Sequence, residues 1–273
     1  METHSTLGLN NTMHNLYKTE EKITDFRLYI GDFEHENGEL DEIFNDLRQA
    51  TPSDTLTIEI ASPGGFVSEL QKFENLINTT FFENTTTILN PYGYSCGALL
   101  FTFGDERLVY VNSTAMFHDV SLGFAGKHSD VKEQAQFDEK AMANYLKPRL
   151  ISYFTKQELE QFFNGKEFWM DCYELCRRGI ATKVLMGQTQ INASYFVKLC
   201  ESVDEFNNFS KQYKNKHIKP IELNYIKSKH DEFGITLQKV NSSESKETKT
   251  TKTTKKVAPK KTKINKEKEN SEG

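Results

Sequence analysis

The serine at position 95 lies in a spacing that several hydrolases use for a catalytic nucleophile. Gly93, Ser95 and Gly97 form the pattern G-x-S-x-G, which places a serine on a sharp turn between a strand and a helix with its hydroxyl exposed. The same residue types also occur in ordinary buried turns. A nucleophilic serine further needs a base to take its proton and backbone N–H groups to stabilise the oxyanion, so the interpretation depends on what the rest of the chain supplies.

His118 and the pair Gly64–Gly65 are the candidate partners of Ser95. An imidazole is matched to proton transfer near neutral pH, and N–H groups of a glycine turn or of a helix N-terminus can approach an oxyanion closely. A lone histidine at a strand end is commonly structural, and two glycines commonly form a simple turn. Catalysis therefore requires that these three segments meet in space.

The pattern between residues 23 and 200 is α/β, and it would bring the three segments together. Parallel strands joined by crossover helices place their carboxyl ends at one edge of a sheet, where such proteins bind ligands. Gly64, Ser95 and His118 each follow or close a predicted strand. The predicted strands are 26–31, 55–61, 85–89, 107–111 and 115–118, and the predicted helices are 39–50, 67–78 and 97–104.

A long, mostly polar helix is predicted over residues 127–154, with a narrow apolar face. Pro148 should kink this helix or end its first part near Lys147. Capping boxes at 155–158 and 171–174 predict the starts of two further helices. Gly179 follows two arginines and should end the second of these two helices.

Four segments in unbroken order resemble the Clp protease proteolytic subunit (ClpP) family, which has the crotonase-like fold. They are "LTIEIASPGG", "GYSCGALLFTFG", "VNSTAMFHD" and "GKEFWMDCYELCRRGIATKVL". The resemblance covers roughly residues 25–186. It implies repeated ββα units, with the long helix protruding as a handle that interleaves two rings. The alternative for that helix is a surface helix packed on its own domain.

Carried over by position, the resemblance implies that Ser95 is the nucleophile and His118 the general base. The acid position falls on Glu167, where the family normally has Asp, and the nearby Asp171 is an alternative acid. The resemblance places the oxyanion donors at the N–H groups of Gly65 and Cys96.

The same resemblance implies substrate contacts from Gly64, Phe66 and Val67. Two residues depart from the family pattern around the serine. Cys96 replaces a methionine, and Tyr94 replaces a small residue and could narrow the pocket.

The resemblance implies a serine endopeptidase subunit of a self-compartmentalised, ATP-dependent protease that cleaves unfolded polypeptides. It implies a ring homo-oligomer, with fourteen subunits as the family form, fed by an AAA+ unfoldase. ATP would bind that partner, so no cofactor and no metal are expected here. The residues 1–22 show no apolar patch matching the family's docking loops, which leaves the unfoldase less well supported than proteolysis.

Three alternatives remain open. A phage-encoded member of the same fold could process capsid or scaffold proteins. A ClpP-like subunit with an inactive site could serve a structural role, since Glu167 is not the family's Asp. An α/β-hydrolase esterase would instead need a late histidine, His217 or His230. These two residues, like His128, lie in polar or irregular surroundings and are expected to be solvated.

Charge and composition divide the 273 residues into four predicted regions. They are a polar segment 1–22, a protease domain 23–200, an extension 201–241 whose structure the pattern does not predict, and a disordered Lys/Thr-rich tail 242–273. The net charge is −5, but the ten Lys and four Glu after residue 245 contribute +6, which leaves −11 for the rest. An acidic body argues against nucleic acid as the main partner.

The four cysteines show no CxxC pair and no zinc spacing. No apolar run approaches the roughly 20 residues that span a bilayer, and the N-terminus lacks the pattern of a secretory signal. We therefore expect a cytoplasmic protein without a membrane partner.

Overall fold

The computed structural model describes residues 22–31, 39–212 and 217–235. The predicted disordered tail and nearly all of the predicted N-terminal segment lie outside these residues. Among the described helices, none is long and apolar enough to cross a membrane.

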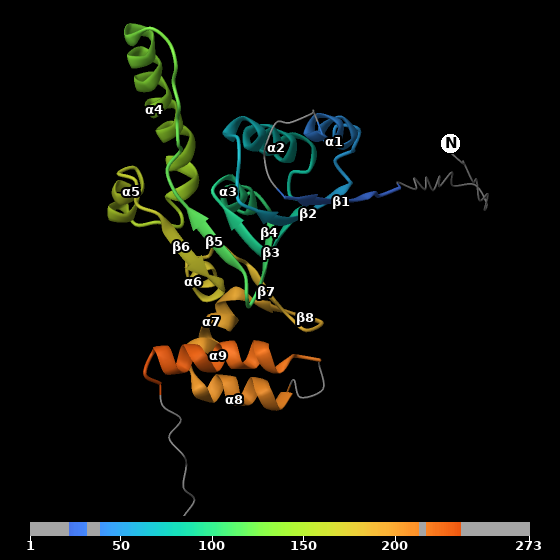
Figure 1. Cartoon of the computed structure of the whole chain (residues 1–273). Coiled ribbons are helices and arrows are strands. Elements are labelled where there is room, and N and C mark those ends of the chain that lie inside the picture. The colour runs from blue at the N-terminus through green and yellow to red at the C-terminus, as the bar shows by residue number, and fades with distance from the viewer. Residues whose placement is uncertain (1–21, 32–38, 213–216, 236–273) are drawn as a thin grey trace, which may run out of the picture. The chain divides into compact units, whose positions relative to one another are not determined.

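The described residues form a mixed α/β fold around one eight-stranded sheet (Figure 1), as the alternating pattern predicted. The main path runs in the order β1-β2-β3-β4-β7-β8, parallel from β1 to β7 and closed by the antiparallel pair β7–β8. The bounds of these strands are Asp25–Ile30, Thr55–Ser62, Thr85–Tyr94, Glu106–Tyr110, Lys183–Met186 and Thr189–Asn192.

Strand β3 divides its pairing between two partners. Residues 86–89 pair with β4, and residues 92–94 pair with β5 (Thr114–Phe117). Strand β5 then pairs in antiparallel fashion with β6 (Phe168–Asp171), a strand that the sequence pattern did not predict. The end of β3, β5 and β6 thus form a three-stranded branch. The predicted strand 85–89 was too short, because β3 continues past Pro91 and Gly93 to Tyr94.

Three helices follow strands β1 to β3 and cover them with apolar side chains. Helix α1 (Glu39–Leu47) contacts α2 (Val67–Thr80), which contacts α3 (Cys96–Phe101). The rings of Phe44 and Phe73 meet at 4.6 Å between α1 and α2. All six residues of α3 are buried, as expected for the short apolar segment that follows Ser95.

Helix α4 (His128–Leu150) is the predicted long helix, and its first turns extend away from the sheet (Figure 1). Only Leu146 and Leu150, near its end, are buried. The helix does not end at Lys147 but runs through Pro148. The proline lies two residues before the last residue, Leu150, and the Ile151 amide still donates to the Lys147 carbonyl at 3.1 Å, a normal hydrogen-bond length.

The two predicted helix starts after α4 are both present. Thr155 and Glu158 form the full capping box of α5 (Lys156–Phe162). Asp171 caps α6 (Cys172–Arg177) by accepting from the Glu174 amide at 2.9 Å. The second half of that predicted box is absent, because the Glu174 carboxylate bonds arginines of its own helix end. Gly179, at φ +72°, follows α6 as predicted.

The described residues after β8 form three helices whose arrangement the sequence pattern did not reveal. Helix α7 (Ala193–Glu201) contacts α6, α8 (Val203–Gln212) and α9 (Pro220–Glu232). Glu222 joins the start of α9 to the β7–β8 turn, because its carboxylate accepts from the Gly187 amide at 2.8 Å and from the Lys219 amide at 2.6 Å.

Candidate active site

Ser95 occupies a sharp turn between β3 and α3. Its φ of 55° and ψ of −123° are unusual for a residue with a side chain. Its amide donates to the Met116 carbonyl of β5 at 2.8 Å, and its carbonyl accepts from the Leu99 amide of α3 at 3.1 Å. The strained turn is therefore held from both sides, as expected for a nucleophile elbow.

Gly64 lies directly against the Ser95 side chain. A Cβ atom added at Gly64 would lie 2.7 Å from Ser95 Cβ and 3.1 Å from Ser95 Oγ. The φ of +113° at Gly64 also disfavours any residue with a side chain. The structure thus brings the turn after β2 and the turn after β3 together, although they are 31 residues apart in the chain.

Cys96 links these two turns. It is the first residue of α3, where an amide has no partner within its own helix. Its Sγ donates to the Gly65 carbonyl at 3.2 Å, so the two residues proposed as oxyanion donors are in contact. Burial raises the pKa of the Cys96 thiol to about 11, even though Ser95 and the Gly65 carbonyl lower it. The thiol is therefore neutral at physiological pH and does not compete with Ser95 as a nucleophile.

His118 directly follows β5, and Glu167 directly precedes β6. In the antiparallel register of these strands Met116 is opposite Trp169 and Phe117 is opposite Phe168. The pairing ends at Phe117 and Phe168, so His118 and Glu167 flank this last pair just beyond the two strands. Within the described residues, no hydrogen bond joins Ser95 to His118 or His118 to Glu167. Catalytic hydrogen bonds are often long in ligand-free enzymes and form only with substrate bound.

Asp171, the alternative acid, lies at the other end of β6, where it is opposite Thr114. Its carboxylate accepts from the Glu174 amide, from Tyr225 Oη at 2.9 Å and from Lys229 Nζ at 2.7 Å. Burial alone would raise the pKa of Asp171, and these three bonds outweigh it and hold the pKa below its usual value.

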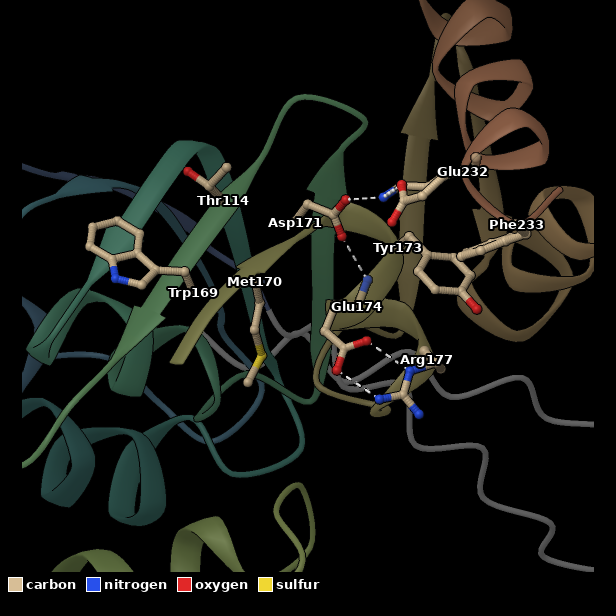
Figure 2. Close-up of a pocket in the computed structure, with 10 residues that line it drawn as sticks. Thr114, Trp169, Met170, Asp171, Tyr173, Glu174, Arg177, Glu232 and Phe233 are labelled. Carbon is tan, nitrogen blue, oxygen red and sulfur yellow. Dashed lines mark hydrogen bonds and ion pairs between the residues drawn. The ribbon is translucent and has the colours of Figure 1, made fainter. Parts of the chain in front are cut away.

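Figure 2 shows the Asp171 carboxylate directed toward Glu232 and Glu174, whereas the Trp169 indole points away from them. Asp171 is thus occupied in joining β6 and α6 to α9. Glu167, which is exposed, directly precedes Phe168, and Phe168 is paired with Phe117, the residue before His118.

An aromatic row lies beside the candidate catalytic residues, and the sequence pattern did not predict it. The Tyr94 ring stacks on Tyr92 at 4.9 Å and meets Trp169 edge to face at 5.1 Å. Trp169 Nε1 donates to Glu167 Oε2 at 3.0 Å. The Oη of Tyr94 lies 3.1 Å from Thr114 Oγ1, on the neighbouring strand.

The other predicted substrate contacts follow the glycine turn. Phe66 is the residue that precedes α2, and its side chain is 52% exposed. Val67 begins α2 and is partly buried against the core. Phe66 directly follows Gly65, the proposed oxyanion donor, and Val67 follows Phe66.

The expectation that His230 is solvated is wrong. Its ring is 4% exposed, its Nε2 lies 2.8 Å from the Leu199 carbonyl, and it packs edge to face on Phe206. Its partners thus belong to the C-terminal helices α7 and α8. This removes one of the two late histidines on which an α/β-hydrolase triad would depend.

Comparison with known proteins agrees with the geometry of this site. No curated protein matches the chain. The model of the Clp protease family matches residues 38–188, which include the turns at Gly64 and Ser95 and all three strands of the branch. The match covers more than half of the 273 residues. The chain therefore belongs to the Clp protease family.

Proposed function

We propose that this chain is a serine endopeptidase, the proteolytic subunit of a self-compartmentalised, ATP-dependent Clp-type protease of the cytoplasm. Its family makes it a ClpP-type peptidase. The observation that carries the serine mechanism is the turn at Ser95, whose strained backbone is held by β5 and α3 and whose side chain meets Gly64.

The proposed reaction is acyl transfer to Ser95 followed by hydrolysis. His118 takes the hydroxyl proton as Ser95 Oγ attacks the peptide carbonyl, and the Gly65 and Cys96 amides stabilise the oxyanion. His118 then gives the proton to the leaving amine. A water molecule attacks the acyl-enzyme by the same route, with His118 again as base. Glu167 orients the imidazole throughout.

The amides suit this role because they need no movement when charge develops. An α-helix N-terminus presents free N–H groups and a positive dipole end, and the glycine turn has no side chain to block the approach. Losing one such donor typically lowers the rate by ~100- to 1,000-fold. The thiol contact between Cys96 and the Gly65 carbonyl supports a fixed spacing of the two donors.

Hydrolysis of an unstructured fluorogenic peptide by the purified full-length chain tests the proposal. The Ser95→Ala variant should lose hydrolysis and labelling by a fluorophosphonate, and the His118→Ala variant should lose most of both. Ser228→Ala is the matched control, since Ser228 is exposed and bonds only the Tyr225 carbonyl on α9. Hydrolysis that persists in Ser95→Ala would reject the serine mechanism.

The assembly is tested separately. Mass photometry should find a ring oligomer, with fourteen subunits as the family form, and a stable monomer would count against the compartmentalised protease. Stimulation of protein degradation by an AAA+ unfoldase and ATP would test the partner.

A catalytically inactive structural subunit is the second candidate. It is favoured by the lack of a hydrogen bond between Ser95 and His118 within the described residues. Wild-type protein that assembles but neither cleaves peptide nor reacts with the fluorophosphonate would support this alternative.

A further inference from the structure

We propose that Trp169 is a positioning residue that holds the Glu167 carboxylate in the orientation it needs toward His118. The inference rests on the proposed serine mechanism and adds a residue to it. It also explains how Glu167 can act as the acid, although its side chain is longer and has more freedom than the aspartate that the family normally has at this position.

The first step is the direct contact between the two side chains. Glu167 directly precedes β6 and lies two residues before Trp169, the spacing at which side chains of an extended chain project from the same face. The indole Nε1–H donates to Glu167 Oε2 at 3.0 Å. This leaves Oε1 to accept from the imidazole. An exposed glutamate without such a bond would sample several rotamers in water.

The second step is what holds Trp169 itself. Its ring meets Tyr94 edge to face at 5.1 Å, and Tyr94 is fixed by stacking on Tyr92 and by the hydrogen bond with Thr114. Tyr94 directly precedes Ser95 in the chain. Trp169 therefore connects the strand that carries the acid to the strand that carries the nucleophile.

The third step is that Trp169 contributes little to the core. Its side chain is 60% exposed, at the edge of a cavity of about 660 Å³ between β6, α6 and α9 (Figure 2). Replacing it by phenylalanine should leave no buried void. A loss of activity in that variant would then not reflect unfolding.

The test is Trp169→Phe, which keeps a ring on Tyr94 and removes the N–H donor. We expect kcat to fall by about 10-fold. This loss is near the lower limit of what a hydrogen bond to a charged group contributes, because water can reach the exposed pair. KM for the peptide should stay nearly constant. Tyr29→Phe is the matched control, since it removes one polar atom from an aromatic side chain that is 71% exposed on β1.

A double-mutant cycle separates positioning from a general structural effect. In the Glu167→Gln background, the further change Trp169→Phe should lower kcat by less than about 2-fold, because its effect passes through the carboxylate. An undiminished loss in that background, or a wild-type kcat in Trp169→Phe alone, would overturn the inference.

Two other outcomes distinguish this inference from the proposed function. If Glu167→Gln retains full activity while Ser95→Ala is inactive, the serine peptidase stands and the role of Trp169 is overturned. If Ser95→Ala retains activity, the proposed mechanism fails, and the inference fails with it.

Discussion

The Gly64→Ala substitution tests whether the glycine turn sets the position of the nucleophile. The new Cβ would lie 2.7 Å from Ser95 Cβ, and ordinary contact begins at 3.4 Å, so the two turns must separate by about 0.7 Å (3.4 minus 2.7). The Tyr94 carbonyl, 3.1 Å from the same point, prevents a simple sideways shift. A misplacement of about 1 Å can lower the rate of an enzyme by ~100-fold, and we expect a loss approaching that size in kcat.

The backbone conformation at Gly64 adds a second effect that must be separated from the first. Placing alanine at φ +113° should itself destabilise the fold by ~1–3 kcal/mol. Gly165→Ala is the matched control, because Gly165 also has a positive φ, +86°, but a Cβ there would meet nothing within 4 Å. The control should lower the thermal midpoint of unfolding and leave kcat unchanged.

Peptide hydrolysis and the rate of fluorophosphonate labelling, both measured well below the unfolding midpoint, are the assays. Circular dichroism checks that each variant is folded at the assay temperature. A Gly64→Ala enzyme that is folded and keeps more than about a third of the wild-type kcat would refute the argument, because the 0.7 Å displacement should lower the rate far more.

Two further predictions concern groups whose pKa is shifted. Cys96 should resist iodoacetamide at pH 7.5 in the native protein and react only on unfolding, since burial raises its pKa to about 11; labelling at the rate of a free thiol would contradict this. The hydrogen bond and charge of Arg178 hold the pKa of Glu158 at about 2, below the usual 4.5, so this pair should stabilise the fold above pH 4.5 and lose that effect as the pH falls toward 2. Relative to wild type, Glu158→Gln should therefore lower the thermal midpoint at pH 7 and flatten its decline in acid, and equal pH profiles would reject the pairing.

Two turns beside the candidate site were predicted from the sequence because glycine, proline or serine follows the strand. The turns after β2 and β3 were recognised because "SPGG" and the Gly93–Gly97 spacing interrupt apolar runs. The same rule failed within β3. The predicted strand ends at residue 89, yet the chain continues past Pro91 and Gly93 along a second partner, β5.

The residues that the pattern missed depend on contacts between distant segments. Strand β6 has only four residues, too few for a clear alternation. The contact between Trp169 and Tyr94 follows from the register of β5 with both β3 and β6, which no local spacing encodes. The burial of His230 likewise depends on a backbone carbonyl 31 residues away.

The candidate site residues were found mainly through the family resemblance. Local pattern alone identified Ser95, His118 and the two glycines as candidates, but it could not choose between Glu167 and Asp171 as the acid. The choice of Glu167 rests on the bonding partners of Asp171, whose carboxylate is engaged by Lys229 and Tyr225 on α9.

Trp169 is the single tryptophan of the chain, so all intrinsic tryptophan emission originates beside Glu167. Because its side chain is already 60% exposed, unfolding should shift the emission maximum only slightly. A molecule or subunit that covers this edge of β6 would instead move the emission to shorter wavelength. The native fluorescence of this protein therefore reports occupancy of one strand edge, and it is a poor measure of whether the remaining sheet is folded.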